Sequence, residues 1–374
     1  KFGPYTTAGT TGWGDVVNFS GADSDEVRAY VLDAVRRWLT EFHIDGLRLD
    51  AVHSYDDRNA YSIMEQINLL ADEIQAELGP NPIIIAESDL NDPRIISDYS
   101  VGGYGLDAQW LDDVHHALHT VVTGENNAYY EDFGTVEILA DTLRHGFRFR
   151  NEYSSFRGRT HGRALDLATI PPWKLITYTT THDQVGNRAQ GDRPSQNLTP
   201  AQHALKAAVI FFSPFTPMIF MGEESYAQTP FPFFVSHTDE ELLRLTSEGR
   251  AHEFARYGWD FADVPDPGDP ATFESAKLDW NFNADASAMY EAYATLLKLR
   301  RELNLAREDL RELQVEHAEN WLTMGYDDVF LAANFSAEPV TVPAGGELIY
   351  SFGSPTVTAN ETQLEPWGFA IIKR

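Results

Sequence analysis

The chain has 374 residues, 43% of them hydrophobic and 23% charged, which is typical of an ordered globular protein with room for more than one domain. Its 28 Lys and Arg against 57 Asp and Glu give a formal net charge of −29, which disfavours binding to nucleic acid or anionic membranes but not to neutral sugars. Cysteine is absent, which excludes disulfides and thiolate chemistry, and no apolar run approaches the roughly 20 residues of a membrane span.

The first part of the chain alternates helical patterns with short apolar strands. Asp23 and Glu26 have capping-box spacing, and the apolar residues that follow Val27 at intervals of four predict a helix that buries one face, with Trp38 and Phe42 beside it. The later pattern predicts a strand over 43–50, a helix over 59–78, strands over 82–86 and 105–110, a helix over 113–122, a strand over 175–180, a helix from Pro200, a buried strand over 218–221 and a helix over 289–302.

This alternation predicts parallel βα units, in a barrel or an open sheet. Residues 123–173 and 224–280 interrupt it and are expected to form excursions over one face. Short strands between 321 and 372, separated by turn residues, predict antiparallel structure. We therefore expect a catalytic βα domain over 1–305 and a C-terminal β-sandwich domain over 306–374.

Three predicted strands end in acids, namely Asp50, Glu87 and Asp183. The carboxyl ends of parallel barrel strands open on one face, so these side chains are expected to converge. Arg48 lies two residues before Asp50, on the same side of the strand, where it can orient that carboxylate. One acid at a strand end is better explained as a helix cap or as the partner of a surface base, but three favour a catalytic site. An ionised and a protonated carboxyl group together can cleave a glycosidic bond.

Three motifs make a resemblance specific. DGLRLDAVH at 45–53, AESD at 86–89 and THD at 181–183 resemble, in order, the nucleophile, acid/base and third-acid motifs of the α-amylase superfamily, glycoside hydrolase family 13. The resemblance implies an α/β fold of the (β/α)8 TIM-type barrel class. It also implies a retaining double displacement that needs no cofactor and no metal.

The resemblance assigns roles to individual residues. It implies that Asp50 is the nucleophile and that Glu87 is first the general acid and then the general base. It implies that Asp183 grips sugar hydroxyls and favours the distorted ring, with His182 and Arg48 as polar support.

The flanking segments are similar to a trehalose-releasing subgroup of this superfamily. The similarity implies hydrolysis of the α-1,4 bond between a maltooligosaccharide and a terminal trehalose unit, with maltooligosyl trehalose and trehalose as the partners and the cytoplasm as the location. The similar segments are 87–94, 110–119, 182–188, 221–224 and 249–254.

One motif of the superfamily is absent from this sequence, an Asp-x-x-x-Asn-His pattern on the third barrel strand. The resemblance therefore implies that the chain is the C-terminal portion of a longer enzyme. An N-terminal part with a β-sandwich and the first βα units would then be its partner in closing the barrel.

Several polar and aromatic residues near the strand ends are candidates for substrate binding. Trp110 is explained equally well by core packing, His53 by a backbone hydrogen bond, and Glu223 by an ion pair with Arg188 or Arg193. The candidates are Arg48, His53, Asp89, Trp110, Asp112, His116, His182, Gln184 and Glu223.

The close histidines His115, His116 and His119 could suggest a metal site beside Asp112, but their spacing identifies no complete ligand set. The aromatic run 231–234 is explained equally well as a wall of a substrate cleft or as loop packing.

Three other functions compete with trehalose release. A related α-glucan enzyme, such as a branching enzyme or glucanotransferase, would share the three acids. A metal-dependent barrel hydrolase could use Asp50, His182 and Asp183 as ligands. A sugar-binding protein without catalysis would need neither Asp50 nor Glu87.

Overall fold

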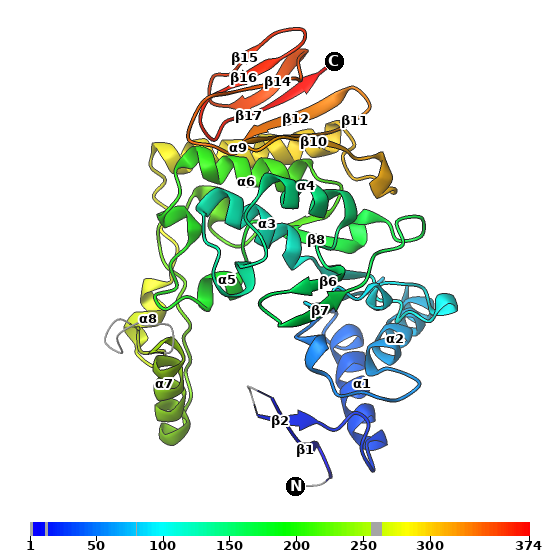
Figure 1. Cartoon of the computed structure of the whole chain (residues 1–374). Coiled ribbons are helices and arrows are strands. Elements are labelled where there is room, and N and C mark those ends of the chain that lie inside the picture. Colours follow the sequence, from blue (N-terminus) through cyan, green and yellow to red (C-terminus); the bar gives the residue numbers. More distant parts are fainter. Residues whose placement is uncertain (1–2, 12–13, 80, 256–263) are drawn as a thin grey trace.

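The computed structural model describes residues 3–11, 14–79, 81–255 and 264–374 and is shown in Figure 1. Its helices are α1 (Asp25–Thr40), α2 (Ile63–Leu78), α3 (Asp112–Thr123), α4 (Val136–His145), α5 (His182–Gly186), α6 (Pro200–Phe212), α7 (Glu240–Ala255), α8 (Pro270–Ser275) and α9 (Ala284–Glu302). Strands that precede α9 are β1 (Thr6–Thr11), β2 (Gly14–Val17), β3 (Gly46–Leu49), β4 (Ile83–Ala86), β5 (Ala108–Trp110), β6 (Arg150–Ser154), β7 (Arg159–Gly162), β8 (Leu175–Tyr178) and β9 (Thr216–Met218).

A five-stranded parallel sheet in the order β3-β4-β5-β8-β9 forms the centre of the molecule, and helices connect its strands. This confirms the predicted parallel βα units. Gly46 begins β3 where a Cβ atom would lie 2.4 Å from the Ile83 carbonyl oxygen, so this close approach to β4 requires glycine. All five carboxyl ends lie at one edge of the sheet, where the predicted acids follow β3, β4 and β8.

The last strand of the sheet differs from its prediction. The sequence indicated a buried strand over 218–221, but β9 is a half-buried edge strand that ends at Met218. The side chains of Ile219 and Met221 are 38% and 45% exposed. Within the described residues, β3 and β9 each pair with one strand, so this sheet is open at both edges.

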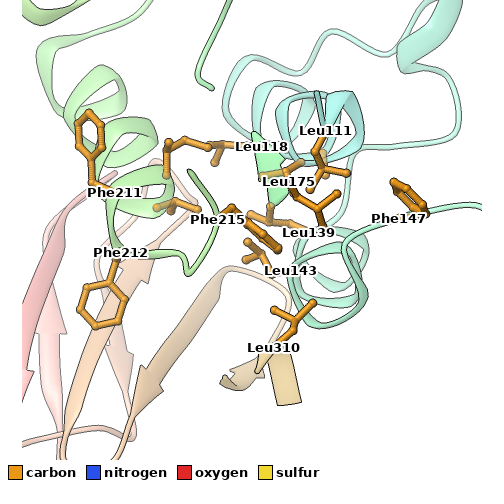
Figure 2. Close-up of a cluster of buried hydrophobic side chains, with 14 of the residues drawn as sticks. Leu111, Leu118, Leu139, Leu143, Phe147, Leu175, Phe211, Phe212, Phe215 and Leu310 are labelled. Carbon is orange, nitrogen blue, oxygen red and sulfur yellow. The ribbon is translucent and has the colours of Figure 1, made fainter. Parts of the chain in front are cut away.

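The hydrophobic core lies where α3, α4 and α6 meet (Figure 2). Leu118 of α3, Leu139 and Leu143 of α4 and Phe211 of α6 are buried there, together with Phe215. Burying one such side chain stabilises the fold by roughly 1.5–3 kcal/mol. This packing fixes the helices behind β5 and β8, and therefore the strand ends that carry the candidate site.

The start and the outer face of α1 also differ from their predictions. Ser24 occupies the N-cap position, and Asp23 precedes it with φ 57°. Glu26 is then the second helical residue instead of the third, so the predicted capping box is wrong. Val27, Val35 and Leu39 are buried, but Trp38 and Phe42 are 43% and 58% exposed.

Both interrupting regions contain regular structure. Residues 123–173 hold α4 and the β6–β7 hairpin, and residues 224–280 hold α7 and α8, which extend away from the central sheet (Figure 1). Part of the second region, 256–263, lies outside the described residues.

Two antiparallel sheets follow α9, which confirms the predicted β structure at the end of the chain. One has the order β10-β11-β12-β17-β14 and the other β13-β16-β15, with Phe330, Val342 and Leu364 in a shared hydrophobic cluster. Helix α4 contacts β10 and β11, so this part packs against the βα region (Figure 1). Their strands are β10 (Gln314–His317), β11 (Trp321–Tyr326), β12 (Val329–Asn334), β13 (Val340–Val342), β14 (Glu347–Phe352), β15 (Thr356–Val357), β16 (Thr362–Leu364) and β17 (Phe369–Lys373).

Among the helices of the described residues, none has both the length and the apolar character needed to cross a membrane.

Candidate active site

One arginine and three acids meet at the carboxyl ends of the parallel strands. Arg48 lies on β3 and Asp50 directly follows it, Glu87 follows β4, and Asp183 is the second residue of α5 after β8. Arg48 Nη1 lies 2.5 Å from Asp50 Oδ1, and Arg48 Nη2 lies 2.8 Å from Glu87 Oε2 and 3.9 Å from Asp183 Oδ2. The guanidinium therefore lies between Asp50 and Glu87, which follow two neighbouring strands, and Asp183 of α5 lies farther from it.

The two acids nearest to Arg48 differ in how far their side chains are exposed to solvent. The Asp50 side chain is 77% exposed and the Glu87 side chain 19%. Burial, the largest influence, raises the pKa of the Glu87 carboxyl, as do Asp183 and Asp50. The Ala51 amide and Arg48 partly oppose the rise. Glu87 therefore keeps its proton to a higher pH than an ordinary glutamate, as a general acid requires.

The backbone around Ala51 fixes the Glu87 carboxyl group. Ala51 has φ 41° and ψ 49°, a left-handed conformation that turns its amide toward β4. Its N–H donates to Glu87 Oε2 at 2.7 Å, and the Val52 N–H donates to the Glu87 carbonyl oxygen at 3.0 Å. The segment that follows one acid therefore orients the other.

Trp110 lies beneath Arg48. The guanidinium carbon is 4.2 Å from the centre of the indole ring, within the range of a cation–π contact. The ring also meets Tyr178 and His182 edge-on, at 5.6 Å and 6.0 Å between centroids. His182 Nε2 lies 3.5 Å from Asp183 Oδ1.

A hollow of about 380 Å³ opens beside Asp50. Tyr55 contributes to its wall, and burial, followed by the negative charges of Asp50 and Glu87, raises the pKa of the Tyr55 hydroxyl to about 12. The sequence analysis missed Tyr55, although its place five residues after Asp50 in the same loop was a usable signal. The lining residues are Asp15, Val16, Val17, Phe19, Asp50, Ala51, Ser54 and Tyr55.

A second group of polar side chains surrounds Asp89. Its Oδ2 accepts from Arg157 Nη2 at 2.7 Å, its Oδ1 lies 3.7 Å from His53 Nδ1, and its carbonyl oxygen lies 2.8 Å from His161 Nε2. Burial acts to raise the pKa of the Asp89 carboxyl, but His53 and Arg157 outweigh it, and the pKa lies below its ordinary value. No sequence pattern signalled Arg157, which the β6–β7 hairpin brings to this loop.

Asp112 and His116 lie on the first turns of α3. Asp112 accepts a hydrogen bond from the Tyr178 hydroxyl, and burial raises the pKa of Asp112 to about 7 against the effect of that bond. His116 stacks on Tyr129 at 4.9 Å, and burial lowers its pKa to about 3, so its ring is neutral at pH 7.

Comparison with known proteins finds relatives over the whole chain. A model described as "Domain of unknown function (DUF3459)" matches residues 309–371. Malto-oligosyltrehalose trehalohydrolase from Mycobacterium tuberculosis is 48% identical over 378 residues, covering 100% of this chain and 65% of the relative. The protein of the same name from Saccharolobus solfataricus is 37% identical, covering 100% of this chain and 64% of the relative. The chain is a homologue of these trehalohydrolases.

A solved structure agrees with the sequence relationship. An α-amylase-like protein from Salmonella typhimurium matches with a TM-score of 0.85 and 31% identity, over 98% of this chain and 63% of that one. The resemblance to the α-amylase superfamily that the three motifs indicated is therefore confirmed. The chain spans 65% of the length of the M. tuberculosis trehalohydrolase.

Glu223 does not reach the hollow of this trehalohydrolase homologue, which corrects the sequence interpretation. Its side chain is buried, and its Oε2 accepts from Thr179 Oγ1 at 2.5 Å. The alternative of an ion pair is wrong too. Arg188 pairs with Glu125 and Asp192, at 2.8 Å each. Arg193 donates to the carbonyl oxygens of Thr229 and Met221. The strand-end argument fails here because β9 ends at Met218, before Glu223, and the Glu223 side chain turns to Thr179, which directly follows β8.

The remaining candidates have partners of their own. Gln184 Oε1 accepts from the Thr181 backbone N–H at 2.7 Å and closes a capping box at the start of α5. His115 lies 2.8 Å from the Thr179 carbonyl oxygen, and His119 lies 2.5 Å from Glu125. Within the described ranges, no three His, Asp or Glu side chains are arranged to share a metal ion.

The aromatic run 231–234 packs largely on itself and its neighbours. Phe231 meets Phe220 at 5.2 Å and Phe234 at 6.0 Å, and Phe234 meets Phe273 at 5.2 Å. These contacts support loop packing for Phe231 and Phe234.

Proposed function

We propose that the protein is a retaining glycoside hydrolase that cleaves the α-1,4 bond between a maltooligosaccharide and a terminal trehalose unit, releasing trehalose. One observation carries this proposal: Arg48 bridges an exposed Asp50 and a shielded Glu87 of raised pKa. Two carboxyl groups in different environments are the equipment of a double displacement. The substrate in this proposal is taken from the names of the trehalohydrolase relatives.

The environments of the two acids assign their chemical roles. Asp50, open to solvent and oriented by Arg48, attacks the anomeric carbon and forms the glycosyl–enzyme bond. Glu87 gives its proton to the departing trehalose oxygen. It then takes a proton from the water that attacks the anomeric carbon and frees Asp50. Asp183, 3.9 Å from Arg48, holds hydroxyl groups of the sugar whose bond breaks.

The polar groups around this centre supply the substrate contacts in the proposal. His53 and Asp89 form one polar pair, 3.7 Å apart, and Asp112 and His116 lie at the start of α3. His182 stands beside Asp183, with half of its side chain exposed. Gln184 lies in the same turn of α5.

The open edge strands β3 and β9 indicate how the parallel sheet is completed. Each edge strand carries exposed apolar neighbours, with Ile44 and Ile83 beside β3 and Ile219 and Met221 beyond β9. We propose that strands from a further part of the protein pair with both edges and close a (β/α)8 barrel. Residues 1–305 would then belong to the catalytic domain. Residues 306–374 would form a separate C-terminal β-sandwich domain.

Product analysis tests the proposed function. The protein is incubated with maltooligosyl trehalose, and NMR follows free trehalose and the anomeric configuration of the released glucan. Trehalose together with an initially retained α-anomer supports the proposal, with Asp50→Asn as the inactive control. Transfer or branching of the glucan without free trehalose would identify a related α-glucan enzyme instead. Activity lost to exhaustive chelation and restored by metal would point to the metal-dependent alternative.

A further inference from the structure

Trp110 cannot present its indole face to a sugar in this structure. The residue is 7% exposed, and the Arg48 guanidinium covers the ring with its central carbon 4.2 Å from the ring centre. An aromatic platform for sugar stacking needs a face open to the substrate. The sequence interpretation of Trp110 as a sugar platform therefore conflicts with its surroundings.

The acids hold the Arg48 guanidinium only in part. It starts on β3 and crosses the end of β4 to reach Trp110 at the end of β5. Among the described residues, neither its buried Nε nor its buried Nη2 has a hydrogen-bond partner, although Nη2 lies 2.8 Å from Glu87 Oε2. Nη1 contacts Asp50, which is mostly exposed, so this bond alone holds the guanidinium weakly. The indole face lies 4.2 Å below the guanidinium carbon and adds a contact that the acids do not supply.

The surroundings of Trp110 hold its ring in place. Tyr178, which is fully buried, meets the ring edge-on, and its hydroxyl donates to Asp112. His182 meets another edge of the ring. Ala108 and Ile176 complete the buried cluster around the indole. The ring is therefore a fixed support.

We propose that Trp110 is a positioning residue that holds the Arg48 guanidinium between Asp50 and Glu87 through a cation–π contact. The proposal deepens the proposed function and rests on it for its meaning in catalysis. The interaction itself, in which Trp110 holds Arg48 and Arg48 acts on the Glu87 carboxyl, does not depend on the identity of the substrate.

The consequence for Glu87 has a definite sign. The charged and polar groups that act on its carboxyl are Arg48, the Ala51 amide, Asp183 and Asp50. Of these, Arg48 and the amide favour the ionised form. A guanidinium that loses its support spends less time near Glu87, so the pKa of Glu87 rises further above its ordinary value.

Trp110→Leu and Trp110→Phe test the link, with Trp280→Leu as the control because Trp280 is 73% exposed. Carbon-13 NMR of labelled glutamate side chains follows the titration of Glu87 without any substrate. We expect Trp110→Leu to raise the pKa of Glu87 by about half a pH unit, Trp110→Phe to raise it less, and the control to leave it unchanged. The alkaline limb of the activity profile should move upward equally, with KM changed less than twofold.

Fluorinated tryptophan at position 110 covers the case in which Trp110→Leu does not fold. Ring fluorines withdraw electron density from the indole face and barely change its shape, so they weaken a cation–π contact and spare packing. We expect the pKa of Glu87 to rise with the number of fluorines. An unchanged Glu87 titration overturns the proposal, and a raised KM with unchanged titration makes Trp110 a sugar contact. If Glu87 responds but the wild-type protein releases no trehalose, the proposed function fails and the positioning link stands.

Discussion

Replacement of Arg48 perturbs the feature on which the candidate site depends. Arg48→Met removes the guanidinium that joins Asp50 to Glu87 and keeps an unbranched side chain over Trp110. Arg48→Lys keeps the charge, but one ammonium group cannot bridge two carboxylates as a planar guanidinium does. We expect activity to fall in the order wild type, Arg48→Lys, Arg48→Met.

The size of the loss follows from exposure. The Arg48–Glu87 pair, with side chains 25% and 19% exposed, is shielded from solvent, but Nη2 makes no hydrogen bond, so this ion pair contributes about 1 kcal/mol. Because the Asp50 side chain is 77% exposed, solvent screening leaves the Arg48–Asp50 pair about 0.5–1 kcal/mol. If all of this energy serves to hold the acids for reaction, kcat/KM falls about 10- to 30-fold in Arg48→Met.

Initial rates of trehalose release at several substrate concentrations measure this loss. Arg58→Met is the matched control, since Arg58 pairs with Asp56 at 2.9 Å on the surface and its loss should change kcat/KM less than twofold. Circular dichroism checks that each variant is folded. An Arg48→Met enzyme that keeps more than about a third of the wild-type kcat/KM would refute the bridging role.

Three further outcomes follow from the same geometry. Asp50→Asn should lower kcat by several orders of magnitude in the same assay, because an amide cannot form the glycosyl–enzyme bond; a tenth of wild-type rate would exclude this role. The general acid must be protonated, and the pKa of Glu87 is raised, so the alkaline limb of the pH profile of kcat/KM should lie above pH 4.5. Glu87→Gln should abolish this limb. A limb at or below pH 4.5 would contradict Glu87 as the general acid. Burial raises the pKa of Glu223 from 4.5 to about 8, so its contribution to the free energy of unfolding is complete below pH 4.5 and is lost as the pH rises toward 8. Urea titrations should show a smaller loss over this range in Glu223→Gln than in wild type, and equal losses would speak against a buried neutral Glu223.

Sequence patterns predicted those parts of the site that depend on strand topology alone. Asp50, Glu87 and Asp183 each follow an apolar strand, and parallel strands bring their carboxyl ends together regardless of the intervening loops. The Arg48–Asp50 contact follows in the same way from a spacing of two along one strand. For these residues, local pattern and global fold impose the same arrangement.

Contacts that depend on the direction of a side chain in a loop or turn could not be predicted from the sequence. The strand-end argument holds for Glu87 but fails for Glu223, because β9 ends before Glu223 and the buried Glu223 side chain accepts from Thr179. Arg157 reaches Asp89 only because the β6–β7 hairpin folds back over 68 residues of sequence. Helical periodicity placed Trp38 near a buried face, but it does not show how far that face extends, and Trp38 is 43% exposed.

Chemical trapping of the reaction intermediate tests the central assignment most directly. A maltooligosyl substrate with fluorine beside the anomeric carbon and a reactive leaving group slows breakdown of the glycosyl–enzyme, so that the adduct can be located by peptide mass spectrometry. We predict one sugar adduct per protein on the peptide that contains Asp50, and no adduct in Asp50→Asn. An adduct on another residue, or none while the enzyme still consumes its natural substrate, would contradict Asp50 as the nucleophile.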